Sequence, residues 1–284
     1  MKTSGNEHQG MKVVGVLLFY LLTFLPLSAK VIKVLAIGNS FSQDAIEQYL
    51  YELAHAQGDS LVIGNAYIGG CSIDRHYDNL KTGKAEYAYR KVVGGVRSER
   101  KNIDLRSIIR DEQWDIITLQ QASRLSGVPS SYANLPQLKR LVQSYTTNLH
   151  VQFAWHMTWA YAEDYTSKDF ITYDNDQRKM YNAIVHTIQQ VLPASGRLPV
   201  IPSGTAIQLL RYRLGDIACR DGFHLSLTIG RYTAACTWCE FLTDRIVDGN
   251  HYHPDTITDE EASACQEAAH EAMFMQQHNR YVIF

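Results

Sequence analysis

Five short apolar runs, each followed by a segment with helical spacing, constrain the fold of this chain more than any other feature. The runs cover residues 34–37, 61–67, 114–119, 150–155 and 198–201. Runs of this kind are typical of strands that are buried on both faces of a sheet. Because parallel strands are joined by right-handed helical crossovers, the order predicts a five-stranded parallel sheet with helices on both faces. The expected fold class is therefore α/β, a three-layer α/β/α sandwich.

The remaining segments fit one domain. The chain has 284 residues, of which 45% are apolar, enough for a sizeable core. We find no internal repeat or linker, so residues 30–284 are predicted as a single domain, with two domains as the alternative. Residues 44–57 and 98–111 are predicted as helices, and 74–97 as a surface excursion or a short hairpin. The formal net charge of −2 gives no sign of a nucleic-acid partner.

The N-terminal segment has the pattern of a secretory signal. Met11-Lys12 is followed by 17 uncharged residues, 13–29, which end in small side chains. A membrane anchor is the weaker alternative, because a spanning helix usually needs about 20 apolar residues. Residues 1–29 are therefore predicted as an N-terminal extension and signal peptide. The mature protein is expected to be exported, periplasmic or extracellular, with no stable membrane anchor after cleavage.

The five cysteines do not suggest a metal or redox centre. Their odd number leaves at least one unpaired within a monomer. Cys236-x-x-Cys239 lies in a helical pattern far from any second motif of this type, which favours buried thiols. His251-x-His253 in a proline-ended turn is interpreted as a surface feature rather than a metal site. We therefore expect no cofactor and no metal.

The first apolar run ends in Gly38-Asn39-Ser40, and a helical segment follows. A strand, a tight turn and a helix lift a side chain clear of the sheet, where the positive end of the helix dipole stabilises negative charge. Ser40 is therefore a candidate nucleophile. The alternative is that Ser40 only caps the helix.

A second signal lies near the other end of the chain, in Asp221-Gly222-Phe223-His224. A carboxylate three residues before an imidazole can bind and orient the ring, which then acts as a base through its other nitrogen. A serine hydroxyl needs such a base to become a nucleophile. Because ligands bind at the carboxyl ends of parallel strands, Ser40 and His224 are expected to meet there.

Two further segments follow predicted strands. Gly69-Gly70 follows the second, and glycines there either let backbone N–H groups approach a ligand or form a plain turn. Residues 155–161 follow the fourth and contain Trp155, Trp159 and Tyr161. These aromatic side chains are predicted to bind substrate, with a hydrophobic lid or loop core as the alternative.

Gly38-Asn39-Ser40 and Asp221-x-x-His224 resemble the first and last sequence blocks of the SGNH (GDSL-like) hydrolases, and the resemblance covers residues 32–250. It implies the flavodoxin-like α/β/α fold of that superfamily. It also implies ester hydrolysis through an acyl-enzyme, with Ser40, His224 and Asp221 as the catalytic triad.

The resemblance further implies an oxyanion hole made by the backbone N–H groups of Ser40 and Gly70, with Gly69 as an alternative, and by a side-chain amide after the third strand. The family usually has Gly-x-Asn there, whereas this chain has Gln120-Gln121-Ala122-Ser123. Gln120 is the first choice for the amide and Gln121 the second. A glutamine in this block is similar to the sialate O-acetylesterase branch.

The predicted function is an exported serine esterase that hydrolyses acyl esters, acetyl foremost, on carbohydrates. Its partner is then a small-molecule or glycan ester. Within the same superfamily, a lipase or thioesterase is an alternative. The alternative from another class is a catalytically silent module that binds glycans through Trp155, Trp159 and Tyr161.

Overall fold

The structure is a computed structural model that describes residues 1, 31–281 and 283. Apart from Met1, the predicted signal segment lies outside the described residues. The described chain forms one seven-stranded sheet in the order β4-β3-β2-β1-β5-β6-β7. Its strands are β1 (Val31–Gly38), β2 (Ser60–Tyr67), β3 (Tyr87–Val93), β4 (Val96–Ile103), β5 (Ile116–Leu119), β6 (Gln152–His156) and β7 (Val200–Ile201).

The five parallel strands β1, β2, β5, β6 and β7 lie where the five apolar runs predict them. The predicted total of five strands is wrong, because β3 and β4 extend the sheet as an antiparallel hairpin beyond β2. The helix predicted for 98–111 is also wrong, since β4 occupies its first part and α4 (Leu105–Arg110) follows. Almost all of β4 is exposed, so its charged sequence lacks the apolar alternation that marks a strand.

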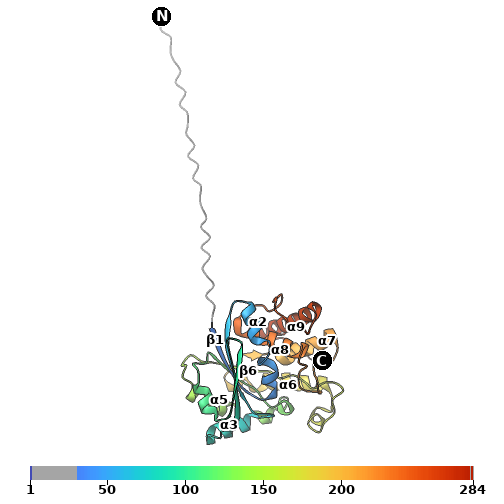
Figure 1. The fold of residues 1–284 in the computed structure, drawn as a ribbon. Coiled ribbons are helices and arrows are strands. Elements are labelled where there is room, and N and C mark those ends of the chain that lie inside the picture. The colour runs from blue at the N-terminus through green and yellow to red at the C-terminus, as the bar shows by residue number, and fades with distance from the viewer. Residues whose placement is uncertain (2–30, 282, 284) are drawn as a thin grey trace.

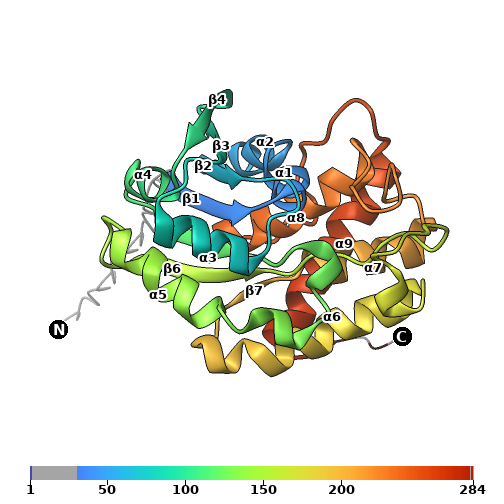
Figure 2. The same ribbon diagram turned by 90° about the horizontal axis from the view of Figure 1, so that it is seen from below.

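Helices cover both faces of the sheet (Figures 1 and 2). Five of them contact one another on one face: α1 (Ser40–Ile46), α2 (Leu50–Ala56), α7 (Ser203–Leu214), α8 (Ile229–Thr243) and α9 (Asp259–Gln277). On the other face α5 (Leu135–Tyr145) contacts α3 (Ile73–Thr82) and α4. The helix α6 (Gln177–Val191) lies next to the short 3-10 helices η2 (Pro129–Tyr132) and η4 (Pro193–Ser195).

The helix predicted for residues 44–57 is divided into α1 and α2. Tyr49 stands between them with a φ of 69°, a left-handed conformation that a continuous helix does not allow. Its hydroxyl donates a hydrogen bond to the backbone carbonyl of Leu227, 2.6 Å away. This tertiary contact, invisible in the sequence, ties the break in the helix to the segment that precedes α8.

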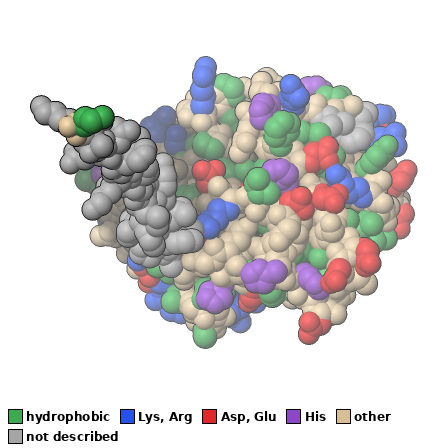
Figure 3. Space-filling model, turned by 90° about the horizontal axis from the view of Figure 1, so that it is seen from above, with side chains coloured by type: hydrophobic (Ala, Val, Ile, Leu, Met, Phe, Trp, Pro, Cys, Tyr) green, Lys and Arg blue, Asp and Glu red, His purple; other side chains and the backbone are tan. Residues whose placement is uncertain are grey.

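The central strand β1 is buried along its length from Val34 to Gly38, as expected for a strand covered on both faces. The carboxyl ends of the parallel strands β1, β2, β5, β6 and β7 therefore emerge at one edge of the sheet, where the loops meet. Within the described residues, no helix is long and apolar enough to cross a membrane. On the face drawn in Figure 3, acidic and basic side chains are intermixed rather than gathered by sign.

Candidate active site

A cavity of about 340 Å³ opens at the carboxyl edge of the sheet and brings the predicted nucleophile and base together. Ser40 lines it from the start of α1, and His224 lines it from the loop before α8. Gly69 and Gly70 contribute the backbone after β2. Two residues that are 184 positions apart in the chain (224 − 40) thus line a single cavity.

Ser40 is the first residue of α1, and Asn39 caps that helix. The Asn39 side chain accepts a hydrogen bond from the backbone N–H of Phe41, at 3.0 Å. The capping role that the sequence left open for Ser40 therefore belongs to Asn39. The half-buried Ser40 hydroxyl forms no hydrogen bond with another described residue, and it remains available to a ligand in the cavity.

Asp221 binds His224 in two ways. One carboxylate oxygen accepts a hydrogen bond from the backbone N–H of His224 at 2.8 Å, and the other lies 2.7 Å from Nδ1 of its ring. Burial opposes ionisation of Asp221, but the hydrogen bonds from His224 outweigh it and lower the pKa of the carboxyl group. The ionised carboxylate fixes the ring so that Nε2 is the nitrogen left to act as a base.

The tip of this loop is held from the segment after β6. The Trp159 indole N–H donates to the carbonyl of Phe223 at 2.8 Å, and its ring stacks on Phe41 with centroids 4.2 Å apart. The backbone N–H of Ala162 donates to the carbonyl of Gly222 at 2.7 Å. Trp159 thereby connects the residue after Ser40 with the residue before His224.

Two backbone N–H groups beside Ser40 are available to an oxyanion. Among the described residues, none accepts a hydrogen bond from the N–H of Gly69 or Gly70. Gly70 has a φ of 59°, which a glycine adopts without strain. The oxyanion-hole role expected of Gly70, or of Gly69, stays a prediction.

The side-chain amide predicted for the oxyanion hole is not placed there. Gln120 and Gln121 are both buried and do not line the cavity. The Gln121 amide donates both to the carbonyl and to the hydroxyl of Ser131, at 2.8 and 3.0 Å. The Gln120 amide donates to Oδ1 of Asn39, at 2.8 Å. The structure thus gives no support to the oxyanion-hole role predicted for these two glutamines, because groups inside the protein bind the Gln121 amide twice and the Gln120 amide once.

Gln120 belongs to a buried hydrogen-bond chain that crosses the carboxyl edge of the sheet. Its Oε1 lies 2.8 Å from Nδ1 of His156, and Nε2 of His156 lies 3.2 Å from the hydroxyl of Ser203. Burial lowers the pKa of His156 to about 3, so its ring is neutral. The chain links the ends of β1, β5, β6 and β7 and fixes Asn39, on which the turn at Ser40 depends.

His156 should make stability depend on pH in the mildly acidic range. The folded protein resists protonating this ring, whereas the unfolded chain accepts a proton below its ordinary value of 6.5. The free energy of unfolding should therefore fall as the pH drops from about 6.5 toward 3, by about 1 kcal/mol per pH unit for one such histidine.

Urea unfolding of wild type and His156→Gln between about pH 6.5 and 4.5 tests this expectation. The variant should lose less stability over the interval than wild type. His186→Gln, at an exposed position on α6, is the control and should keep the wild-type slope. Equal slopes in wild type and His156→Gln would contradict the assignment of His156 as a neutral buried ring.

Of the three aromatic residues predicted to bind substrate, one lines the cavity. Tyr161 lines the cavity, and its hydroxyl lies 2.9 Å from that of Ser123. Trp155 and Trp159 are 1% and 0% exposed and do not line the cavity. Both indoles pack in the core, so the lid-or-core alternative is correct for them.

The sequence reasoning missed most of the aromatic and charged lining of the cavity. These residues are Tyr67, Arg124, Tyr165, Asp169 and Phe223. Tyr67 is the last residue of β2, and the rule that ligands bind at the carboxyl ends of strands was a signal for it. Arg124 lies in the short 3-10 helix η1 (Ser123–Leu125), and the other three lie on loops whose path across the edge no local pattern gives.

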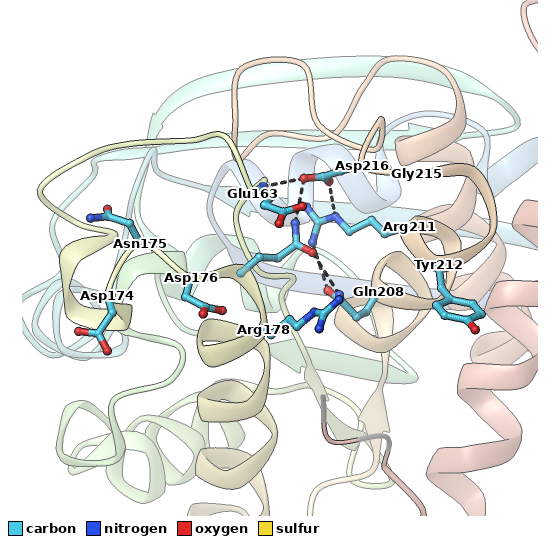
Figure 4. A pocket seen from close by; sticks show the side chains of 11 residues that line it. Glu163, Asp174, Asn175, Asp176, Arg178, Gln208, Arg211, Tyr212, Gly215 and Asp216 are labelled. Atoms are coloured by element: carbon cyan, nitrogen blue, oxygen red, sulfur yellow. Dashed lines mark hydrogen bonds and ion pairs between the residues drawn. The ribbon is translucent and has the colours of Figure 1, made fainter.

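A larger hollow of about 910 Å³ is lined by Glu163, by residues 174–178 and by residues from 208 to 216, and it carries no reactive pair (Figure 4). Its polar groups bind one another: Arg211 pairs with Asp216 at 2.7 Å, and Gln177 donates to the same carboxylate at 2.9 Å. None of the described residues that line it is a serine, cysteine or histidine. Size alone therefore does not identify the site, and the smaller cavity holds the chemistry.

The cysteines and the His251-x-His253 turn, which were considered for metal or redox chemistry, are not grouped into a site in the described part of the chain. All five cysteines are free thiols. His253 pairs with Asp259 at 2.9 Å between Nε2 and Oδ1. Within the described residues, no group of three or more histidine, cysteine, aspartate or glutamate side chains is arranged to hold a metal ion.

Comparison with known proteins shows a strong similarity to one family. The family described as "Domain of unknown function (DUF4886)" matches residues 33–272. The crystal structure of a DUF4886 family protein from Bacteroides uniformis is 46% identical in sequence, with a TM-score of 0.85. The match covers 89% of this chain and 98% of that one. No curated protein matches this chain.

Other solved structures are similar at a much lower level. A candidate GDSL-like lipase from Parabacteroides merdae is 13% identical with a TM-score of 0.48, over 76% of this chain and 98% of that one. LAE5, an alpha/beta hydrolase enzyme from the metagenome of Lake Arreo, is 12% identical with a TM-score of 0.47, over 76% and 96%. Similarity at this level carries no inference about activity, which has to come from the site itself.

Proposed function

This chain belongs to the DUF4886 family, and we propose that it is a serine esterase that removes short acyl groups, acetyl foremost, from carbohydrate esters. The observation that carries the proposal is the shared cavity: Ser40 and His224 line it together, and Asp221 binds the ring of His224 from behind. A hydroxyl, an imidazole and an ionised carboxylate in this order are the elements of nucleophilic acyl transfer.

In the proposed reaction, the Ser40 hydroxyl attacks the ester carbonyl while Nε2 of His224 accepts its proton. No hydrogen bond joins the Ser40 hydroxyl to this ring in the described residues, and such contacts often tighten only when substrate binds. Asp221 stabilises the imidazolium that forms. His224 then returns the proton to the leaving alcohol, and the carbonyl carbon stays bonded to Ser40 as an acyl-enzyme. Water, deprotonated by the same ring, releases the acid and restores Ser40.

The negative oxygen of the tetrahedral intermediate needs donors that are already in place. The backbone N–H groups of Gly69 and Gly70 line the cavity without a partner among the described residues, and the N–H of Ser40 stands at the start of α1. One such donor is typically worth about 100- to 1000-fold in kcat. We assign the hole to backbone groups alone, since Gln120 and Gln121 are bound elsewhere.

The size and lining of the cavity favour a small polar substrate over a long acyl chain. A volume of about 340 Å³ is at the lower end of ligand pockets. Tyr67, Tyr161 and Tyr165 line it together with Arg124 and Asp169, so hydroxyl, guanidinium and carboxylate groups are available to a polar substrate. The predicted signal within residues 1–29 would place the enzyme outside the cytoplasm, where glycan esters are accessible.

A chain-length series tests this function. The purified protein should hydrolyse p-nitrophenyl acetate and release acetate from acetylated glycans. It should hydrolyse p-nitrophenyl octanoate at least about tenfold less efficiently, since one missing or extra methylene is already worth about 1–3 kcal/mol in a closely fitting pocket. A fluorophosphonate probe should add one adduct, detected by intact mass. A preference for octanoate would favour the lipase alternative, and binding of glycans without hydrolysis would favour the silent module.

A further inference from the structure

The loop that carries Asp221 and His224 is a small hairpin closed by backbone hydrogen bonds. The backbone N–H of Arg220 donates to the carbonyl of His224 at 2.8 Å, and the N–H of Ser226 donates to the carbonyl of Ala218 at 2.7 Å. Cys219 and Leu225 form an isolated antiparallel bridge between these two bonds. Asp221 and His224 thus lie toward the tip of a hairpin, with Arg220 directly before Asp221 and Leu225 directly after His224.

The carboxylate of Asp44 joins the closed end of this hairpin, at Arg220 and Leu225, to α1, the helix that carries Ser40. Asp44 lies four residues after Ser40, one turn along α1, and is 1% exposed. It accepts a hydrogen bond from the backbone N–H of Leu225 at 2.8 Å, and both its oxygens lie 3.2 Å from Nη1 of Arg220. The Arg220 guanidinium also donates to the carbonyl of Leu225.

The other side of the same carboxylate is held by α8. Arg231 donates to Oδ1 of Asp44 through Nε at 2.9 Å and through Nη2 at 2.6 Å. A buried carboxylate with this many charge-assisted partners has a fixed position, because moving it would break several of these bonds at once. Asp44 therefore fixes the distance between α1, the hairpin and α8 at one point.

We propose that Asp44 is a positioning residue that sets the place of His224 relative to Ser40. This inference rests on the proposed esterase function for its kinetic consequence. Asp44 contacts neither the cavity nor the catalytic ring, and it acts through the two residues that flank Asp221 and His224 in the chain. Trp159 binds the tip of the hairpin and Asp44 binds its closed end, so the backbone on both sides of His224 is held in place. Small displacements of such a group are costly, since about 1 Å can lower the rate about 100-fold.

The test compares two arginines with matched surroundings. Arg220 is 34% exposed and pairs with Asp44, and Arg245 is 34% exposed and pairs with the 4% exposed Asp59 at 3.1 Å, between the end of α8 and the start of β2. Arg220→Gln should lower kcat on p-nitrophenyl acetate about 10- to 100-fold and change KM less than about threefold. Arg245→Gln should lower Tm about as much as Arg220→Gln does, but it should keep the wild-type kcat. Asp44→Asn, which keeps an acceptor for Leu225 but loses the charge that both Arg220 and Arg231 bind, should lower kcat at least as much as Arg220→Gln.

A second measurement does not depend on activity. In NMR spectra, the proton that His224 shares with Asp221 should give a downfield resonance in wild type, absent in Asp221→Ala. Arg220→Gln should shift or broaden it, and Arg245→Gln should not. If the wild type hydrolyses no ester, the proposed function fails, and this resonance alone decides the positioning role. An unchanged resonance and an unchanged kcat in Arg220→Gln would overturn that role.

Discussion

Replacing Ser40 by alanine should abolish ester hydrolysis, with kcat/KM reduced about 10⁴-fold or more. The reason is chemical: Ser40 is the α1 residue whose hydroxyl lines the cavity with His224, and without it the imidazole has no nucleophile to deprotonate. Stability should change by less than about 0.5 kcal/mol, because the half-buried hydroxyl has no hydrogen-bond partner among the described residues. Initial rates on p-nitrophenyl acetate and urea unfolding measure the two quantities.

Ser144→Ala is the matched control, since Ser144 is an exposed serine on α5, far from the cavity lining. It should keep wild-type activity and the fluorophosphonate adduct, both of which Ser40→Ala should lose. If Ser40→Ala still reacts with the probe and turns over substrate, another side chain is the nucleophile and the proposed mechanism is wrong.

Replacing Gly222 by alanine should nearly eliminate activity while leaving every proposed catalytic side chain in the protein. Gly222 has a φ of 88°, and a Cβ there would lie 2.1 Å from Cδ2 of Tyr165. The left-handed conformation costs an alanine roughly 1–2 kcal/mol, and the overlap with the ring adds about 1–3 kcal/mol. Because Gly222 lies between Asp221 and His224, the strain should displace the imidazole and lower kcat about 100-fold.

Gly58→Ala separates backbone strain from the overlap. Gly58 has a φ of 84°, and nothing lies within 4 Å of a Cβ built there. In this variant the free energy of unfolding should fall only by the cost of the left-handed conformation, and kcat should stay at the wild-type value. Adding Tyr165→Ala to Gly222→Ala should recover part of the lost free energy of unfolding. If Gly222→Ala has wild-type kcat, the exact placement of this loop does not limit catalysis.

The parts of the site that could be predicted from the sequence are those set by short-range geometry. Asp221 reaches His224 because three residues separate them, so the contact depends on one turn of the chain. Ser40 reaches the sheet edge because a buried strand ends directly before it. The parallel strands were equally predictable, since burial on both faces makes them continuous apolar runs.

The parts that could not be predicted depend on partners distant in the chain. Gln120 looks like a free amide after a strand, and only the fold shows that Asn39 and His156 bind it. Trp159 looks like a binding aromatic, and only the packing on Phe41 places it in the core. The helical spacing around Asp44 gave no hint that Arg220 and Arg231 bind it from about 180 positions away. Local patterns do not encode such contacts.

The hairpin of β3 and β4 has a consequence for how the folded protein behaves in a concentrated solution. The outer side of β4 presents backbone groups that a strand of another molecule could join, which is a common start of aggregation. Its exposed side chains include Arg97, Glu99, Arg100 and Lys101, and charges at such a margin oppose the docking of a further strand. At the opposite margin, β7 is only two residues long and offers little to pair with. The sheet is thus protected against growth in both directions.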